Sequence, residues 1–202
     1  KSRSGDWLEG FRLDPAKHPL STPSGKIEIF STTIDGFGYA DCPGHAVWLE
    51  PFERLGGAGN NKFPLHLISP QPKRRLHSQY DQSAYSQAGK IQGREPLTLH
   101  PSAAAKRNIQ AGDLLRVFND RGACVVGAAI NEHIKEDVAI LPTGAWFAPS
   151  TEIAGLEANG NPNVLTKDKG TSSLAQGPSA HTCLVEVVKL SVEELQALGA
   201  GS

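Results

Sequence analysis

Closely spaced prolines constrain the first sixty residues of this chain more than any other feature. Proline lacks a backbone N–H and ends an α-helix, so no long helix fits between prolines at 15, 19, 23, 43 and 51. One β-strand is expected there, over residues 26–30, because apolar and charged side chains alternate after a turn. Residues 56–61 read Gly-Gly-Ala-Gly-Asn-Asn, which is typical of a linker. We therefore expect 1–61 to be the end of one domain with its linker, and 62–202 to be a second domain.

Short apolar runs separated by turns dominate residues 62–202. They predict strands over 65–68, 114–118, 123–130, 138–141 and 184–190, with a tight turn at 119–122 joining two of them into a hairpin. A short helix is expected over 101–107, with proline in its first turn. Ser191 and Glu194 have the spacing of a capping box at the start of a closing helix. Many short strands and few helices predict a mainly β fold that resembles a barrel.

Composition excludes several classes of protein. The chain has 20 basic and 21 acidic residues and a net charge of -1, whereas nucleic-acid binders are strongly basic. No apolar run approaches the roughly 20 residues of a membrane helix, so we expect no membrane insertion. The three cysteines, Cys42, Cys124 and Cys183, are odd in number and widely spaced, which argues against a disulfide framework. The absence of Met predicts a mature segment or a fragment of a longer protein.

The usual catalytic motifs are missing from the sequence. It contains no phosphate-binding loop, no Rossmann glycine pattern and no hydrolase signature. Cys42 and His45 could supply two zinc ligands, but a structural zinc ion takes four and no second pair lies nearby, so no metal site is expected. Asp113 and Asp120 have the positions of turn and cap residues. Catalysis contained within this chain is therefore not expected.

Polar residues gather in three segments between the apolar runs. Residues 73–79 combine arginines, whose planar donors suit phosphate oxygens, with His, Ser and Gln. Residues 159–166 and 170–182 are rich in amides, hydroxyls and glycines, which suit the edge of a purine-like ring. Each segment alone fits a solvated turn. Three together in one small domain predict a large polar ligand such as a nucleotide cofactor.

An ordered series of segments carries a family resemblance. The segments are 75–79, 93–96, 112–113, 117–122, 143–146, 160–166 and 170–177, and residues 22–28 and 38–45 precede them in the same order. On these residues the chain resembles the C-terminal part of bacterial molybdopterin oxidoreductases. Within that family it is similar to the branch of dimethyl sulfoxide, trimethylamine N-oxide and biotin sulfoxide reductases.

The resemblance implies a fold, a cofactor and a set of binding residues. The fold is a six-stranded double-psi β-barrel preceded by an irregular segment. The cofactor is molybdenum bis(molybdopterin guanine dinucleotide), bound jointly with upstream domains. At the Gln71 position the family often has His, and none of the residues implied here is a metal ligand. The residues implied to line the cofactor are Gln71, Arg75, His77, Ser78, Gln79, Asn161, Asn163, Gln176, Gly177 and Ser179.

The resemblance also implies an activity for the parent protein. That activity is transfer of an oxygen atom from an N-oxide or S-oxide to molybdenum, with the metal-ligating Ser far upstream, so the chain alone would be inactive. The implied partners are the remaining domains, the small substrate and a c-type cytochrome or another electron donor. The implied compartment is the periplasm, with the cytoplasm as the alternative. Two other hypotheses stay open, namely a formate dehydrogenase or nitrate reductase of the same superfamily and a free-standing nucleotide-binding module.

Overall fold

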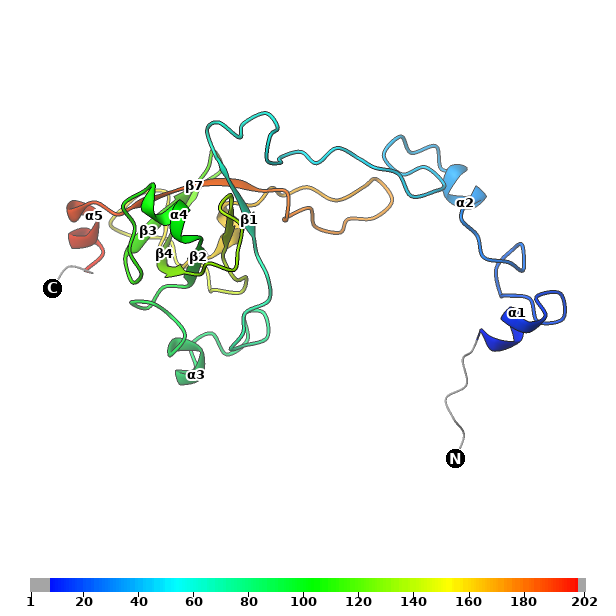
Figure 1. The fold of residues 1–202 in the computed structure, drawn as a ribbon, viewed down its shortest axis with the longest axis horizontal. Coiled ribbons are helices and arrows are strands. Elements are labelled where there is room, and N and C mark those ends of the chain that lie inside the picture. The colour runs from blue at the N-terminus through cyan, green and yellow to red at the C-terminus, as the bar shows by residue number, and fades with distance from the viewer. Residues whose placement is uncertain (1–7, 200–202) are drawn as a thin grey trace. The chain divides into compact units, whose positions relative to one another are not determined.

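Six strands among the described residues, 8–199, close into a barrel in this computed structural model (Figure 1). Neighbouring strands follow the order β2-β5-β1-β7-β3-β4, and a parallel pairing of β2 with β4 closes the ring. The two-residue strand β6 (Leu156–Glu157) pairs with β4 outside the ring. The expected mainly β fold with a six-stranded barrel is confirmed. The barrel strands are β1 (Leu65–Ile68), β2 (Pro96–Leu99), β3 (Leu114–Phe118), β4 (Ala123–Ile130), β5 (Val138–Ile140) and β7 (Leu184–Lys189).

Pairing across the barrel joins segments far apart in the chain. β3 and β4 form the expected antiparallel hairpin, while β7 lies antiparallel between β1 and β3. β1 pairs with β5, and β2 with β4, in parallel. Leu67, Leu97, Leu115 and Val117 belong to the core of the barrel and are at most 1% exposed. Burial of these side chains supplies the main driving force for the fold.

The described helices are short, and for the first sixty residues the closely spaced prolines predict this. The first two precede the barrel, and α4 begins at proline, as expected for the segment 101–107. Both halves of the predicted capping box are present, because Ser191 accepts from the N–H of Glu194 at 3.2 Å and Glu194 accepts from the N–H of Ser191 at 2.8 Å. None of the helices within residues 8–199 is long and apolar enough to cross a membrane. They are α1 (Glu9–Leu13), α2 (Thr32–Asp35), α3 (Ala84–Gln87), α4 (Pro101–Ala105), α5 (Val192–Ala197) and the 3-10 helix η1 (Pro162–Val164).

The strand expected over residues 26–30 is wrong. Ile27 and Ile29 are 69% and 87% exposed, and no described strand pairs with this segment. The segment has a local hydrogen bond instead of backbone pairing with a neighbouring strand: the hydroxyl of Thr22 donates to the carbonyl of Lys26 at 2.6 Å. Alternating side chains specify a strand only when a neighbouring strand and an apolar layer are available to it.

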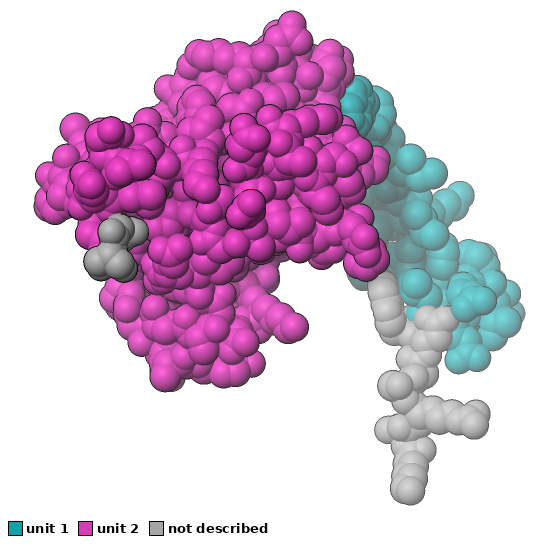
Figure 2. Space-filling view, turned by 60° about the vertical axis from the view of Figure 1, so that its left-hand side comes forward, with its two compact units in different colours: residues 1–49, 171–177 teal, residues 50–170, 178–202 magenta. Residues whose placement is uncertain are grey.

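The chain divides into two compact units, shown in different colours in Figure 2. One contains residues 1–49 and 171–177, and the other contains residues 50–170 and 178–202. In the first unit the carboxylate of Asp41 accepts from both the N–H and the hydroxyl of Ser173, at 2.9 and 3.2 Å. These bonds hold the tip of the loop 171–177 within that unit. The domain boundary after residue 61 stays a prediction.

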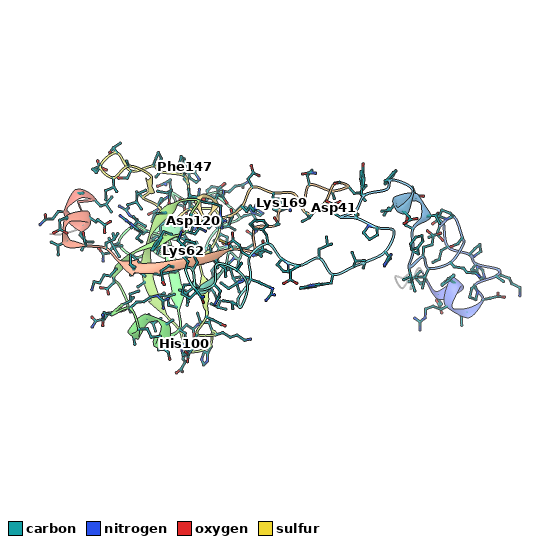
Figure 3. The ribbon with its side chains drawn as sticks, turned by 90° about the horizontal axis from the view of Figure 1, so that it is seen from above. Asp41, Lys62, His100, Asp120, Phe147 and Lys169 are labelled. Carbon is teal, nitrogen blue, oxygen red and sulfur yellow. The ribbon has the colours of Figure 1, made fainter. Side chains whose placement is uncertain are left out.

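Glu53 fastens the segment before β1 to the barrel. Its carboxylate accepts from the N–H of Leu184 at 2.7 Å and pairs with the guanidinium of Arg121. Lys62, on the same segment, pairs with Asp120 of the hairpin turn (Figure 3). Burial acts to raise the pKa of Glu53, but the bonds from Arg121 and Leu184 outweigh it and lower the pKa from its ordinary value of 4.5.

The lowered pKa of Glu53 predicts a stability contribution that depends on pH. Because the folded-state pKa is depressed, the contribution is present above the unfolded-state pKa and is lost as pH falls through the folded-state pKa. Glu53→Gln should therefore be less stable than wild type near pH 7, and the gap should narrow near pH 3. Urea unfolding at both pH values measures this difference in the free energy of unfolding. Glu132→Gln is the control, because Glu132 is an exposed carboxylate in a turn. A gap of equal size at both pH values would contradict the prediction.

Candidate functional site

Three loops of the barrel unit meet around a polar pocket of about 500 Å³. The first loop follows β1 and the second follows β5, and these two strands are parallel neighbours, so their carboxyl ends open at the same end of the barrel. The third loop follows β6 and contains η1. The pocket is lined by His77 and Ser78 from the first loop, Thr143, Gly144, Ala145, Trp146 and Phe147 from the second, and Asn161 and Asn163 from the third.

The first loop is a tight turn with unusual backbone geometry. The N–H of Gln79 donates to the carbonyl of Leu76 at 2.9 Å, and His77 and Tyr80 have φ values of 50° and 61°. Non-glycine residues rarely adopt positive φ, and this conformation persists only where the surroundings hold it. The side-chain amide nitrogen of Gln71 lies 3.1 Å from Nδ1 of His77 and orients its ring. The turn contributes His77 and Ser78 to the lining of the pocket.

The second loop packs directly on the first. Gly144 has a φ of 91°, and a Cβ at this position would lie 2.0 Å from the carbonyl oxygen of His77. Only glycine permits this approach of the two backbones. Trp146 adds a second link, since its indole Nε1 donates to the carbonyl of Ser78 at 2.8 Å. Trp146 and Phe147 (the latter labelled in Figure 3) are 53% and 64% exposed and place aromatic surface at the rim.

A buried carboxylate organises the third loop. Glu157 is 2% exposed. Its two oxygens accept from four backbone N–H groups at 2.8 to 3.0 Å, those of Ala148, Asn159, Gly160 and Asn161. The side-chain oxygen of Asn161 then caps η1 by accepting from the N–H of Asn163 at 2.9 Å. Within residues 8–199, no hydrogen bond engages the side-chain amide of Asn163, a residue that lines the pocket.

The structure brings together only part of the predicted set of binding residues. His77, Ser78, Asn161 and Asn163 line one pocket, and Gln71 contacts it through His77. Gln79 belongs to the same turn but does not line the pocket. The hydroxyl of Ser179 donates to the carbonyl of Lys169 at 2.9 Å, and Ser179 does not line the pocket. Gln176 and Gly177 lie in the loop 171–177, which belongs to the other unit. Cofactor contacts of all ten residues stay predictions.

Arg75 is not among the residues that line the pocket. Its side chain is 2% exposed, and its guanidinium pairs with the carboxylates of Asp81 and Glu95. It also donates to the carbonyls of His77 and Thr143, each at 3.0 Å. The sequence predicts a contact between Arg75 and a phosphate, but the guanidinium is engaged by protein oxygens.

Two groups of residues at the site were not predicted from the sequence. One is the second loop, where the aromatic pair Trp146 and Phe147 closely follows a Thr-Gly turn, a signal that could have been used. The other consists of the buried acids Asp81, Glu95 and Glu157, which are at most 3% exposed. Nothing in the sequence distinguishes these carboxylates from those on the surface, because burial of an acid depends on partners that only the fold supplies.

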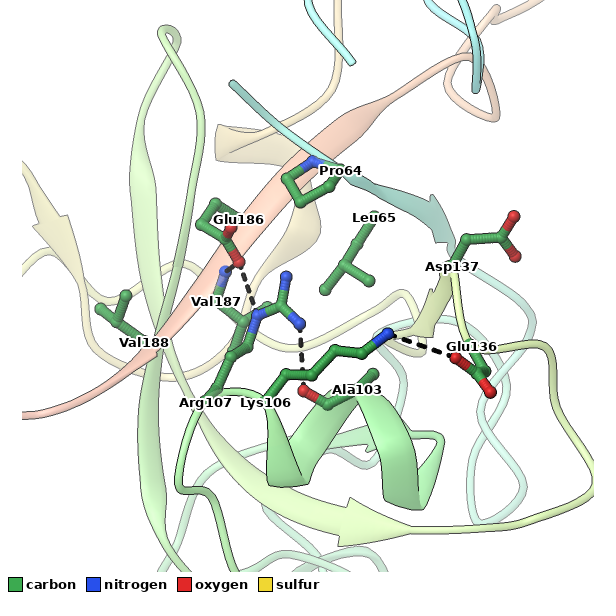
Figure 4. A pocket seen from close by; sticks show the side chains of 10 residues that line it. All are labelled: Pro64, Leu65, Ala103, Lys106, Arg107, Glu136, Asp137, Glu186, Val187 and Val188. Carbon is green, nitrogen blue, oxygen red and sulfur yellow. Dashed lines mark hydrogen bonds and ion pairs between the residues drawn. The ribbon is translucent and has the colours of Figure 1, made fainter. Parts of the chain in front are cut away.

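A larger cavity of about 730 Å³ lies beside α4 and β7 (Figure 4). Its two cationic groups are already paired, Lys106 with Glu136 at 3.4 Å and Arg107 with Glu186 at 2.7 Å. Asp137 adds a third carboxylate to its lining. Excess negative charge disfavours a phosphate-bearing ligand here, so the pocket formed by the three loops is the better candidate. No group of three or more His, Cys, Asp or Glu able to hold a metal ion occurs among the described residues.

Comparison with known proteins gives several relatives with high sequence identity. The chain is 51% identical over 185 residues to the biotin sulfoxide reductase of Cereibacter sphaeroides, covering 92% of this chain and 24% of that protein. It is 46% identical to the dimethyl sulfoxide/trimethylamine N-oxide reductase of the same organism and 48% identical to trimethylamine-N-oxide reductase 1 of Escherichia coli, covering 89% and 90% of this chain and 22% of each relative. The chain thus spans less than a quarter of these curated relatives. The resemblance to this branch is confirmed.

A solved structure and a family model agree with the assignment from these relatives. Acetylene hydratase from Pelobacter acetylenicus superimposes with a TM-score of 0.70 at 20% identity, covering 88% of this chain and 25% of that one, which shows a shared fold. The family described as Molydopterin dinucleotide binding domain matches residues 65–184, a span that contains all three loops of the pocket. The chain therefore belongs to the family of molybdopterin dinucleotide binding domains.

Proposed function

We propose that this chain is the C-terminal cofactor-binding portion of a molybdenum oxidoreductase that removes an oxygen atom from an N-oxide or S-oxide, and that 62–202 is its cofactor-binding domain. The observation that carries the proposal is the pocket of three loops, inside the span matched by the family. Its relatives include enzymes named for reduction of biotin sulfoxide, dimethyl sulfoxide and trimethylamine N-oxide. The chain would be inactive without the rest of the enzyme.

The lining of the pocket fits the polar cofactor that the family implies. Molybdopterin guanine dinucleotide presents ring edges and phosphate oxygens, which are complemented by the His77 ring, the Ser78 hydroxyl and the amides of Asn161 and Asn163. Gln71 would act by orienting His77. When bound, the cofactor supplies two-electron oxygen-atom transfer at molybdenum, and the protein binds and orients it. The bis form, shared with upstream domains, is part of the proposal.

The wider setting is also proposed from the branch. The partners would be the remaining domains of the enzyme, a small N-oxide or S-oxide and a c-type cytochrome or another electron donor. We propose the periplasm as the compartment, because the N-oxide reductases that segment 177–182 resembles are exported.

The full-length protein that contains this chain tests the proposal. It is purified from cells grown with molybdate, and molybdenum, released pterin and oxidation of a reduced viologen by trimethylamine N-oxide are measured. Metal, pterin and N-oxide turnover together are the expected result. Turnover with sulfoxides alone would support the proposed cofactor and restrict the proposed substrate to S-oxides. Folded protein without pterin would refute the proposal, and protein from molybdate-starved cells is the control.

A further inference from the structure

We propose that four buried charged side chains, Arg75, Asp81, Lys90 and Glu95, form a positioning cluster that holds the loops of the pocket in their binding arrangement before the cofactor arrives. We call them the buried charge cluster. The inference rests on the proposed function only for the identity of the ligand. The effect of the cluster on the arrangement of the loops does not depend on the proposed function.

The cluster is a compact, electrically balanced group inside the barrel unit. Its side chains are between 0% and 4% exposed. Lys90 lies 3.0 Å from Asp81 and 4.0 Å from Glu95, and Arg75 lies 3.4 Å from Asp81 and 3.1 Å from Glu95. Each cation therefore contacts both anions. Burial raises the pKa of Glu95 in spite of the opposing pull of Arg75 and Lys90.

Two members of the cluster bond directly to the backbone of the first two pocket loops. Arg75 donates to carbonyls at His77 and Thr143, at 3.0 Å each. Asp81 accepts from the N–H of Trp146 at 3.3 Å, in the second loop. The backbone of these loops is thus tied to the cluster at three points.

The cluster also reaches the third loop. Lys90 donates to the side-chain oxygen of Asn159 at 3.3 Å, and the amide of Asn159 donates to the carbonyl of Trp146 at 2.8 Å. Asn159 thereby joins the second and third loops through one side chain. Each pocket loop thus has a hydrogen bond to a member of the same cluster.

Stability alone is a poor explanation for such a cluster. Moving charged groups out of water carries a large desolvation cost, so apolar residues of equal volume often give equal or greater stability. Apolar residues could not bond to the carbonyl of Thr143 or to the N–H of Trp146. The first loop also carries positive φ at His77, which needs an external constraint. Positioning accounts for both the charges and their bonds.

A charge-balanced double variant tests the proposal without leaving an unpaired buried charge. In Asp81→Asn/Lys90→Met both members of one ion pair become neutral, while Arg75 and Glu95 keep each other. Lys90→Arg retains the charge and serves as the conservative variant. Lys106→Met/Glu136→Gln removes an exposed pair of the same kind beside the other cavity, and is the matched control. All are made in the full-length protein.

The first readout needs no cofactor. Hydrogen–deuterium exchange is measured on protein from molybdate-starved cells, in peptides that cover 143–147 and, as a fold control, 114–118. The double variant should exchange about ten-fold faster at 143–147 and unchanged at 114–118, with Lys90→Arg and the exposed-pair control like wild type. Unchanged exchange at 143–147, or an equal rise in both peptides, would overturn the proposal.

The second readout is retention of pterin in protein from cells grown with molybdate. The double variant should lose pterin about ten-fold faster than wild type during gel filtration, as expected when supporting contacts are removed. Equal loss from the double variant and from wild type would overturn positioning while leaving the proposed function intact. Wild-type protein without any pterin would instead refute the proposed function, and the exchange experiment would still decide whether the cluster orders the loops.

Discussion

Gly144→Ala should destabilise the protein by about 2 to 5 kcal/mol and abolish most cofactor binding, because the new Cβ would lie 2.0 Å from the carbonyl oxygen of His77. One contribution is backbone strain, since φ is 91° at this position. The other is steric, since the first two loops would have to separate. That separation breaks the bond from Trp146 to Ser78 and widens the pocket. Urea unfolding and pterin content of the full-length protein measure the two effects.

Gly112→Ala is the matched control for this prediction. Gly112 has a φ of 90°, but apart from its own chain neighbours nothing lies within 4 Å of the place that a Cβ would occupy. It should therefore show only the strain, about 1 to 2 kcal/mol, and keep normal pterin content. If both variants behaved alike, close packing of the two loops would not be what requires glycine at 144.

Glu157→Ala should lower the free energy of unfolding by about 3 to 5 kcal/mol, because four backbone N–H groups lose their shared acceptor at a site that is 2% exposed. Each buried N–H left without a partner costs about 1 to 3 kcal/mol, and partial access of water limits the sum. The third loop should then lose its shape, and Asn161 would no longer be held against the pocket.

Glu157→Gln and Glu152→Ala complete this experiment. Glutamine keeps one acceptor oxygen, so Glu157→Gln should lose less stability than Glu157→Ala. It should still be less stable than wild type, because the N–H groups bonded to the other oxygen remain unpaired. Glu152 is an exposed carboxylate in the connection before β6, and its removal should leave the free energy of unfolding nearly unchanged. Urea unfolding measures stability, and amide exchange over 158–163 reports the loop. A loss for Glu157→Ala no greater than for Glu152→Ala would contradict the prediction.

Much of the barrel could be predicted from the sequence, because most of its strands are apolar runs with turns on either side. The hairpin of β3 and β4 is local in the chain, so the pattern alone defines it. β2 was not predicted because it begins at Pro96, a residue more typical of turns, and owes its conformation to pairing with β4 and β5. Residues 26–30 show the opposite error: their alternating pattern predicted a strand, but no strand forms there because no described strand pairs with them.

The site was predictable where its chemistry lies in polar side chains grouped along the chain. Composition marked only the segments 73–79 and 159–166, and the family resemblance singled out His77, Ser78, Asn161 and Asn163 within them, which the structure places around one pocket. The supporting groups were not found, because Asp81 and Glu157 act from inside the protein, where their partners are backbone atoms of other segments. Such partners follow from the closed barrel and cannot be predicted from local composition.

The place of β7 between β1 and β3 has a consequence for how the protein is made. At a translation rate of about 5 to 20 residues per second, the first strands emerge several seconds before the strand that joins them. Until residue 189 has left the ribosome, β1 and β3 each present an open edge, and open edges recruit other chains. A nascent chain interrupted before Leu184 would keep both edges exposed, so premature termination should yield an aggregating product and not a smaller folded one.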